Sequence, residues 1–260
     1  MSPLKTKVSA DAYLRGLLSR EAVDISLRSP LRTLEADIFD LCHGFAGRRL
    51  LEVYPGGAFE KGTANASGIA IDFVASFSPL ATEPMQALYE GLFAELAAQG
   101  WDPVRRDVSI AMMVGDLAVD IIPARRESLS TDTHELWLDR QQRALKTNLG
   151  QHVLDTISSG HRDEIRVLKL WRDQNGLDFP SFYLELSVAA ALRKRPVAGL
   201  AENVWAIFGY LETLFPARSV VDPASPLNVV SDQLKAPGRE AVRRAAQEAR
   251  AGRAWSEIIR

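Results

Sequence analysis

The sequence is poor in the residues that form disulfide frameworks and histidine metal sites: its 260 residues include one cysteine and four histidines. The lone Cys42 excludes a disulfide framework. Its apolar, helical surroundings predict a small core residue, with a reactive thiol as the alternative. The histidines lack the spacing of metal ligands, and the sequence has no nucleophile elbow or P-loop. These histidines are His43, His134, His152 and His161.

The sequence also lacks an excess of either charge and any long apolar run. Charged residues make up 25%, hydrophobic residues 47%, and the net charge is −2, as in ordinary globular proteins. This balance gives no support for a surface that binds a long nucleic-acid duplex. The basic run 193–195 is expected to be a solvated helix end. Because residues 1–7 lack an apolar signal region and no stretch is long enough to span a bilayer, we expect a cytoplasmic protein without a membrane partner.

Hydrophobic periodicity predicts an α+β fold. A mixed β-sheet with N-terminal helices would form a catalytic domain over 1–138, and a helical bundle would follow over 139–260, with the active-site cleft between them. The predicted strands are 49–54, 69–77, 108–114 and 117–122. The predicted helices are 9–20, 30–47, 84–100, 139–158, 161–175, 181–193, 200–215 and 239–251.

A glycine turn and an acidic strand carry the chemistry of this sequence. Glycines 56 and 57 precede the strand, and a backbone without side chains can bring N–H groups close to phosphates. Alternate residues of a strand share a face, so positions 70 and 72 point the same way. Asp120 has the matching phase on a nearby strand. Taken singly, such features are most often a plain turn and surface acids, but together they indicate a site.

Aspartates at positions 70, 72 and 120 would form a cage for two Mg²⁺ ions, with Mn²⁺ as a substitute, but position 70 is Ala. One ion would lower the pKa of an attacking hydroxyl, and the other would neutralise the leaving pyrophosphate. Asp72 would still retain a metal–nucleotide complex, because Mg²⁺ often binds through one or two carboxylates plus phosphates. Loss of the third carboxylate is expected to cost roughly 2.7–4 kcal/mol of transition-state stabilisation.

Several short motifs, in order along nearly the whole chain, resemble those of bacterial CD-NTases. These are relatives of cyclic GMP-AMP synthase and oligoadenylate synthetase in the polymerase β-like superfamily. Gly56-Gly57-Ala58-Phe59-Glu60-Lys61-Gly62-Thr63-Ala64 is similar to the family's Gly-Ser-Phe-x-Lys-Gly-Thr-Ala loop, with Ala58 in place of Ser. Either glycine of the pair fits that register. The other matching stretches are 20–24, 29–32, 119–124, 168–171, 180–185 and 222–228.

The resemblance implies roles for individual residues. Asp72 and Asp120 would bind metal, with Asp120 nearest the attacking hydroxyl. Asn228 would contact a base or cap a turn, and these two roles stay open. A surface position is the alternative for Lys169. The residues expected to hold the nucleotide are Gly56, Gly57, Ala58, Lys61, Thr63, Lys169, Ser181 and Asn228.

Two explanations of Ala70 are open. The residue is either a deliberate substitution of the first catalytic Asp, which traps a substrate complex, or a natural loss in a binding-only protein. The rest of the site looks intact, which favours substitution. In both cases the resemblance implies a catalytically impaired chain.

The resemblance implies an enzyme that joins NTPs or dNTPs into an oligonucleotide signal in bacterial antiphage defence, acting on an effector protein encoded nearby. The product would be cyclic, or linear and even grown from a protein hydroxyl. A pseudoenzyme that binds a nucleotide or a partner protein is the second hypothesis. An RNA-tailing enzyme ranks third, because a basic surface and an added RNA-binding domain are missing. The tyrosines that would offer a hydroxyl are Tyr13, Tyr54, Tyr89, Tyr183 and Tyr210.

Overall fold

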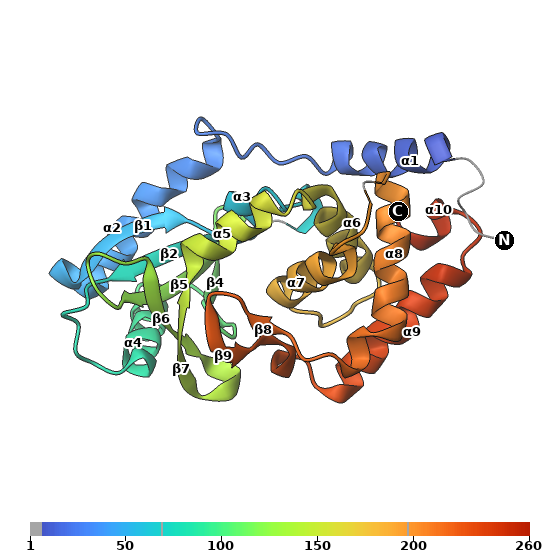
Figure 1. The fold of residues 1–260 in the computed structure, drawn as a ribbon. Helices are drawn as coiled ribbons and strands as arrows, with labels where there is room; N and C mark the ends of the chain where they lie inside the picture. Colours follow the sequence, from blue (N-terminus) through green and yellow to red (C-terminus); the bar gives the residue numbers. More distant parts are fainter. Residues whose placement is uncertain (1–6, 69, 197) are drawn as a thin grey trace. The chain divides into compact units, whose positions relative to one another are not determined.

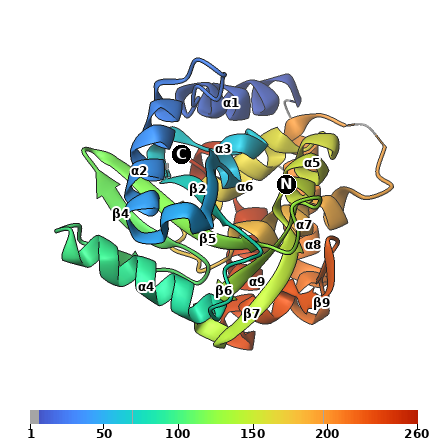
Figure 2. The ribbon, with the colours of Figure 1, turned by 90° about the vertical axis from the view of Figure 1, so that its left-hand side faces the viewer.

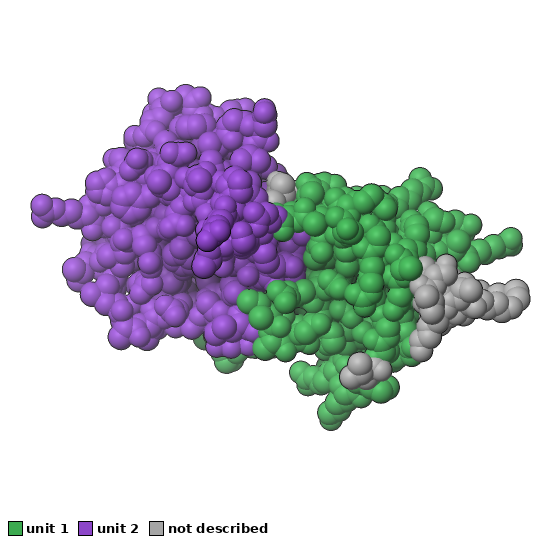
Figure 3. Space-filling view, turned by 90° about the horizontal axis from the view of Figure 1, so that it is seen from above, with its two compact units in different colours: residues 1–23, 65–67, 156–260 green, residues 24–64, 68–155 purple. Residues whose placement is uncertain are grey.

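A computed structural model describes residues 7–68, 70–196 and 198–260. The chain forms two compact units, which Figure 3 colours separately. The sheet unit comprises residues 24–64 and 68–155, and the helical unit comprises residues 1–23, 65–67 and 156–260. The division into domains 1–138 and 139–260 stays a prediction.

A mixed β-sheet forms the sheet unit (Figure 1). Its strands run in the order β1-β2-β5-β4-β3, and β6 pairs with both β5 and β7. The pair β2 and β5 is parallel, and the other pairs are antiparallel. The strands are β1 (Leu50–Pro55), β2 (Ala70–Phe77), β3 (Val104–Arg105), β4 (Ile110–Val114), β5 (Leu117–Arg126), β6 (Thr133–Leu138) and β7 (Arg143–Asn148).

One face of this sheet packs on helices α2 (Leu34–Ala46) and α4 (Met85–Ala98) (Figure 2). Odd-numbered residues of β2 from Ile71 to Phe77 point into this core, as period-2 alternation requires. On α2, Ile38 and Cys42 face them one helical turn apart, both fully buried. Burial raises the pKa of the Cys42 thiol to about 12. Cys42 is therefore the core residue that its surroundings predict, and a reactive thiol is not supported.

The even-numbered residues of β2 lie on the other face, and the last of them, Ser76, belongs to a buried polar network. The His134 Nδ1–H donates to the carbonyl oxygen of Asp132 at 2.9 Å, so Nε2 accepts from the Ser76 hydroxyl at 3.1 Å. Arg126 Nε donates to the same hydroxyl oxygen at 3.3 Å. Burial lowers the pKa of His134. Burial is the main cause of this shift, the positive charge of Arg126 adds to it, and the hydrogen bond to Asp132 opposes it.

The helix predicted over 139–158 is wrong in its first half. Residues 143–148 form β7 opposite β6, and α5 begins only at Leu149 (Leu149–Ser158). On β7, Leu145 and Thr147 are buried while their neighbours are more exposed, which is the period of a strand. The short helix α3 (Gly57–Lys61) was also not predicted.

The helical unit has the helices that the sequence predicts after residue 160, and the helix predicted over 9–20. Its core is aromatic: the rings of Phe179, Tyr183 and Phe215 lie 5.0–5.3 Å apart, and Trp171 packs on Phe208 at 5.1 Å. An unpredicted hairpin joins β8 (Val221–Asp222) to β9 (Ser225–Val229). The helices are α1 (Lys7–Arg20), α6 (Arg162–Gln174), α7 (Ser181–Leu192), α8 (Leu200–Thr213), α9 (Ala236–Ala251) and α10 (Trp255–Ile258).

Short 3-10 helices join several of these elements. They are Pro30–Thr33, Gly47–Arg49, Ala66–Gly68, Asp139–Gln141, Phe215–Ala217 and Val230–Gln233. Over the described part of the chain, no helix has both the length and the apolar character needed to span a membrane.

Candidate active site

Two aspartates stand side by side on the polar face of the sheet. Asp72 on β2 is the register partner of Asp120 on the parallel strand β5, and Ala70 is the partner of Ala118. Neighbouring strands lie about 4.8 Å apart, and residues in register project to the same side. The strand phase inferred from the sequence is confirmed: both acids share one face, with the Ala70 methyl next to them.

The glycine turn touches Asp72 directly. Gly57 has φ +53°, and a Cβ there would lie 2.8 Å from the Asp72 Cβ and overlap its carboxyl group. The Ala58 N–H points to Asp72 Oδ2 at 3.4 Å, and the Gly56 N–H donates to the Asp72 carbonyl oxygen at 2.8 Å. Gly56 itself is extended, and a Cβ there would lie 3.1 Å from the Val74 side chain and 4.0 Å from the Asp72 carbonyl oxygen. Gly57 is thus the position of this turn that requires glycine.

Two residues that the sequence analysis missed surround Asp120. The Ser109 hydroxyl donates to Asp120 Oδ1 at 3.3 Å. Burial raises the pKa of Asp120, while the positive charge of Arg106 and the Ser109 hydrogen bond oppose that shift. Ser109 could have been found from the strand pattern. It precedes Ala111, the register partner of Asp120, by two residues and therefore lies on the same face of the sheet.

The raised pKa of Asp120 has a consequence for stability. Because its pKa is higher in the folded chain than in the unfolded one, the carboxyl stabilises the fold below its ordinary pKa of about 3.9, and this contribution is lost as the pH rises. We therefore expect Asp120→Asn, which keeps an acceptor for Ser109, to raise the thermal midpoint at about pH 7. The gain should disappear at about pH 4. A lower midpoint for the variant near neutrality would contradict this assignment.

The acid pair fits one metal ion and not two. Two carboxylates suit one Mg²⁺ whose remaining ligands are phosphate oxygens and water, whereas the two-ion cage needs a carboxylate at position 70. Within residues 7–68, 70–196 and 198–260, no three Asp, Glu, His or Cys side chains gather as a metal site. When bound, the ion would neutralise phosphate charge and lower the pKa of an attacking hydroxyl.

Two residues predicted to bind nucleotide from the glycine loop are buried. Lys61 is 7% exposed and Thr63 is fully buried, with the Thr63 N–H donating to the Ala58 carbonyl oxygen at 2.9 Å. The turn that carries them is closed by Gly62 at φ +68°. In this conformation they support the loop, and direct contact between their side chains and a nucleotide stays a prediction.

Lys169 and Ser181 belong to the helical unit. Lys169 is buried, and its Nζ lies 2.9 Å from Glu185 Oε1, so it is not the solvated helix position that was the alternative. Ser181 is exposed at the first position of α7, where its Oγ accepts from Arg172 Nη1 at 2.8 Å. Their action on the same nucleotide as Asp72 stays a prediction.

Asn228 is buried in the β8–β9 hairpin. Its Nδ2 donates to Asp222 Oδ2 at 3.1 Å, and Asp222 Oδ1 accepts from the Ala224 N–H at 2.9 Å. These bonds hold the hairpin turn, which supports the turn-forming role of Asn228. Among the described residues its buried Oδ1 has no hydrogen-bond partner, so contact with a base stays open beside that role.

The tyrosine hydroxyls are poorly placed as acceptors of a nucleotide. Burial raises the pKa values of Tyr54, Tyr89 and Tyr183 to about 12. Tyr13 donates to the Ile259 carbonyl oxygen at 2.8 Å, and Tyr210 is buried. In this conformation no tyrosine is an exposed nucleophile.

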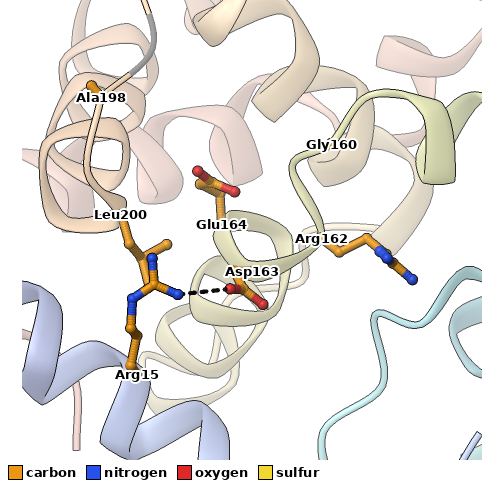
Figure 4. A pocket seen from close by; sticks show the side chains of 7 residues that line it. All are labelled: Arg15, Gly160, Arg162, Asp163, Glu164, Ala198 and Leu200. Atoms are coloured by element: carbon orange, nitrogen blue, oxygen red, sulfur yellow. Dashed lines mark ion pairs between the residues drawn. The ribbon is translucent and has the colours of Figure 1, made fainter.

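A polar pocket of about 260 Å³ lies in the helical unit, apart from the residues predicted for the site (Figure 4). Arg15 of α1 and Asp163 of α6 face each other across it, 3.6 Å apart. Glu164 is buried there and accepts from Asn203 at 2.7 Å. Arg15, Asp163 and Glu164 thus have polar partners within the protein, and none of the predicted site residues lines this pocket.

Comparison with solved structures identifies the fold. The Escherichia coli MS115-1 CdnC:HORMA-deltaN complex matches with 19% identity and TM-score 0.66, over 94% of this chain and 84% of that chain. The Bradyrhizobium diazoefficiens CD-NTase CdnG in complex with GTP matches with 16% identity and TM-score 0.68, over 94% and 93%. A cytoplasmic RNA terminal U-transferase matches with 12% identity and TM-score 0.60, over 95% and 96%. No protein-family model and no curated protein matches the sequence.

The chain therefore has a CD-NTase-like nucleotidyltransferase fold, an α+β fold with a mixed sheet. This agrees with the resemblance inferred from the motifs. Because all these identities are below 20%, the likeness establishes the fold, and the activity is argued from the site.

Proposed function

We propose that this chain is the scaffold of a cytoplasmic Mg²⁺-dependent nucleotidyltransferase that joins NTPs or dNTPs into an oligonucleotide signal. Its setting would be bacterial antiphage defence, and its target an effector protein encoded nearby. The observation that carries the proposal is the register pairing of Asp72 with Asp120, beside a turn that requires glycine at position 57. Ala70 leaves the site one carboxylate short, so this form of the chain is impaired.

The reaction assigns a task to each acid. The oxygen of an acceptor hydroxyl bonds to the α-phosphorus of a triphosphate, and the bond from that phosphorus to the β-phosphate oxygen breaks, releasing pyrophosphate. The hydroxyl proton moves to the Asp120 oxygen that Ser109 does not bind. Asp72, held beside the glycine turn, would position the metal–triphosphate complex.

The helical unit would supply the remaining contacts with the nucleotide. Lys169 would act as a point charge shared between Glu185 and the phosphates, and Ser181 would offer its exposed hydroxyl. Asn228 Oδ1 would accept from a base. The product, cyclic or linear, follows from how the acceptor is held. The burial of Tyr89, Tyr183 and Tyr210 and the partial burial of Tyr13 and Tyr54 speak against growth from a tyrosine hydroxyl of this chain.

One observation favours a second candidate function. With Ala at position 70 the site keeps the acids for one ion and lacks the third carboxylate, which suits a pseudoenzyme that binds a nucleotide or a partner protein. An RNA-tailing enzyme shares the fold. We rank it last, because the net charge of −2 gives no sign of an RNA surface.

The test compares the unmodified chain with Ala70→Asp. Both are incubated with Mg²⁺ and the four NTPs, then the four dNTPs, and products are identified by mass spectrometry. Oligonucleotides made only by the Asp form support the enzyme. No product from either form, with nucleotide retained in equilibrium dialysis, supports the pseudoenzyme.

A further inference from the structure

An arginine without an assigned task stands on the outer side of Asp120. Arg106 follows β3, and its N–H donates to the Ser109 carbonyl oxygen at 2.9 Å. Because Arg105 pairs with Ile110, Arg106 stands opposite Ser109. The Ser109 hydroxyl donates to Asp120, so Ser109 lies on the face of the acids. Residues that stand opposite each other on paired strands project to the same face, which places Arg106 there too.

The guanidinium of Arg106 is available, unlike that of its neighbour. Arg106 is exposed, and among the described residues its guanidinium has no hydrogen bond or ion pair. Arg105 points to the helical face, where it bonds Glu90 at 2.7 Å and lies 3.6 Å from the centre of the Phe93 ring. Arg105 thus packs against α4, whereas the Arg106 guanidinium is exposed on the face of the acids.

The backbone at Arg106 is fixed in advance. The Tyr89 hydroxyl lies 2.9 Å from the carbonyl oxygens of both Arg106 and Ser109. Tyr89 is fully buried on α4. This contact holds the turn between β3 and β4 in place, so a ligand would need to order only the Arg106 side chain.

An apolar floor extends from the acids to the same edge of the sheet. Ala111 is the register partner of both Asp120 and Val104, and Met113 is the partner of Ala118. All of these lie on the face of the acids. Val104 is 50% exposed and Met113 is 54% exposed. A large exposed methionine and valine on a site face offer a surface for a flat base or a sugar.

We propose that Arg106 binds a phosphate group of the acceptor, whose base or sugar rests on Val104 and Met113. The glycine turn lies on the β1–β2 side of the acid pair, and Arg106 lies on the β4–β3 side, with Ser109 between it and Asp120. A planar guanidinium binds phosphate through two N–H groups. This arrangement selects a phosphorylated nucleotide as acceptor over a nucleoside or a protein hydroxyl. The inference rests on the proposed nucleotidyltransferase function.

The first test uses kinetics in the Ala70→Asp background. Arg106→Gln should raise KM for a nucleoside triphosphate acceptor roughly tenfold to a hundredfold. The loss should be larger in KM than in kcat, and the pH profile of kcat reports separately on the Arg106 charge that opposes the raised pKa of Asp120. KM for a nucleoside acceptor should not change. Arg105→Gln is the matched control and should leave every constant unchanged. Equal effects of the two substitutions would overturn the inference.

The second test needs no catalysis and uses the chain with Ala70. Methionine labelled with ¹³C at the methyl group reports on Met113, and the buried Met85 and Met112 serve as internal references. Titration with nucleoside monophosphates should shift the Met113 signal with at least one base, and the parent nucleoside should bind at least about tenfold more weakly. Arg106→Gln should remove that difference, and Arg105→Gln should keep it.

The two tests separate the inference from the proposed function. If Ala70→Asp makes no product, the enzymatic function fails, while the Met113 titration still decides whether phosphate is read by Arg106. If the restored enzyme is active and no nucleotide shifts Met113 in an Arg106-dependent way, only the inference fails.

Discussion

Replacing Ala70 by Asp should convert the chain from inactive to active with Mg²⁺ and nucleoside triphosphates, by at least about a hundredfold in kcat. Position 70 lies on the face of Asp72 and Asp120 and is partly exposed, so a carboxylate there has room and points to the acid pair. The added group completes the set of ligands that a two-ion site requires. Release of pyrophosphate and mass spectrometry of the products measure the gain.

Ala70→Asn is the control for this gain. It matches Asp in shape and lacks the charge that attracts a second cation, so it should remain as inactive as Ala70. Equal rates for the Asn and Asp forms, or full activity of the unmodified chain, would show that the missing carboxylate is not what limits this site.

Gly57→Ala should abolish metal-dependent nucleotide binding and, in the Ala70→Asp background, lower kcat/KM by at least about a hundredfold. The added methyl group would overlap the Asp72 carboxyl, so either that side chain or the turn must move. A positive φ adds a backbone cost of roughly 1–2 kcal/mol for any L residue. Equilibrium dialysis with a labelled nucleotide measures the loss of binding.

Gly115→Ala separates the two causes. Gly115 also has a positive φ of 59°, but a Cβ there meets nothing within 4 Å. Gly115→Ala should therefore carry a similar backbone cost of roughly 1–2 kcal/mol and leave nucleotide binding nearly unchanged. If both alanine variants lose binding equally, strain in the chain and not displacement of Asp72 would explain the result.

The sequence was sufficient to place the acid pair because strand geometry is nearly fixed. Two residues of separation set the phase of positions 70 and 72, and the structure pairs them with 118 and 120. The choice between Gly56 and Gly57 needed coordinates, since it depends on the space next to Asp72. Contact between Gly57 and a carboxylate fifteen residues further along the chain leaves no local signal.

The features that the sequence did not show have a common physical cause, which is pairing with distant segments. Residues 139–148 include Leu, Arg, Gln, Ala and Lys, all good helix formers. Residues 143–148 nevertheless form a strand, because they pair with β6. The burial of Lys169 also has no signal on its own helix, because its partner Glu185 lies on the next helix. Arg106 could not be told from Arg105 until the strand register showed which one faces Asp120.

Asp72 and Asp120 are expected to form a metal site that lacks one ligand at position 70. Anomalous diffraction from crystals grown with Mn²⁺ and a non-hydrolysable nucleoside triphosphate tests it most directly. The unmodified chain should show one Mn²⁺ bound by both aspartates, and Ala70→Asp should show two ions about 3.5–4 Å apart. Two ions in the unmodified chain, or none at Asp72 in either form, would contradict the account.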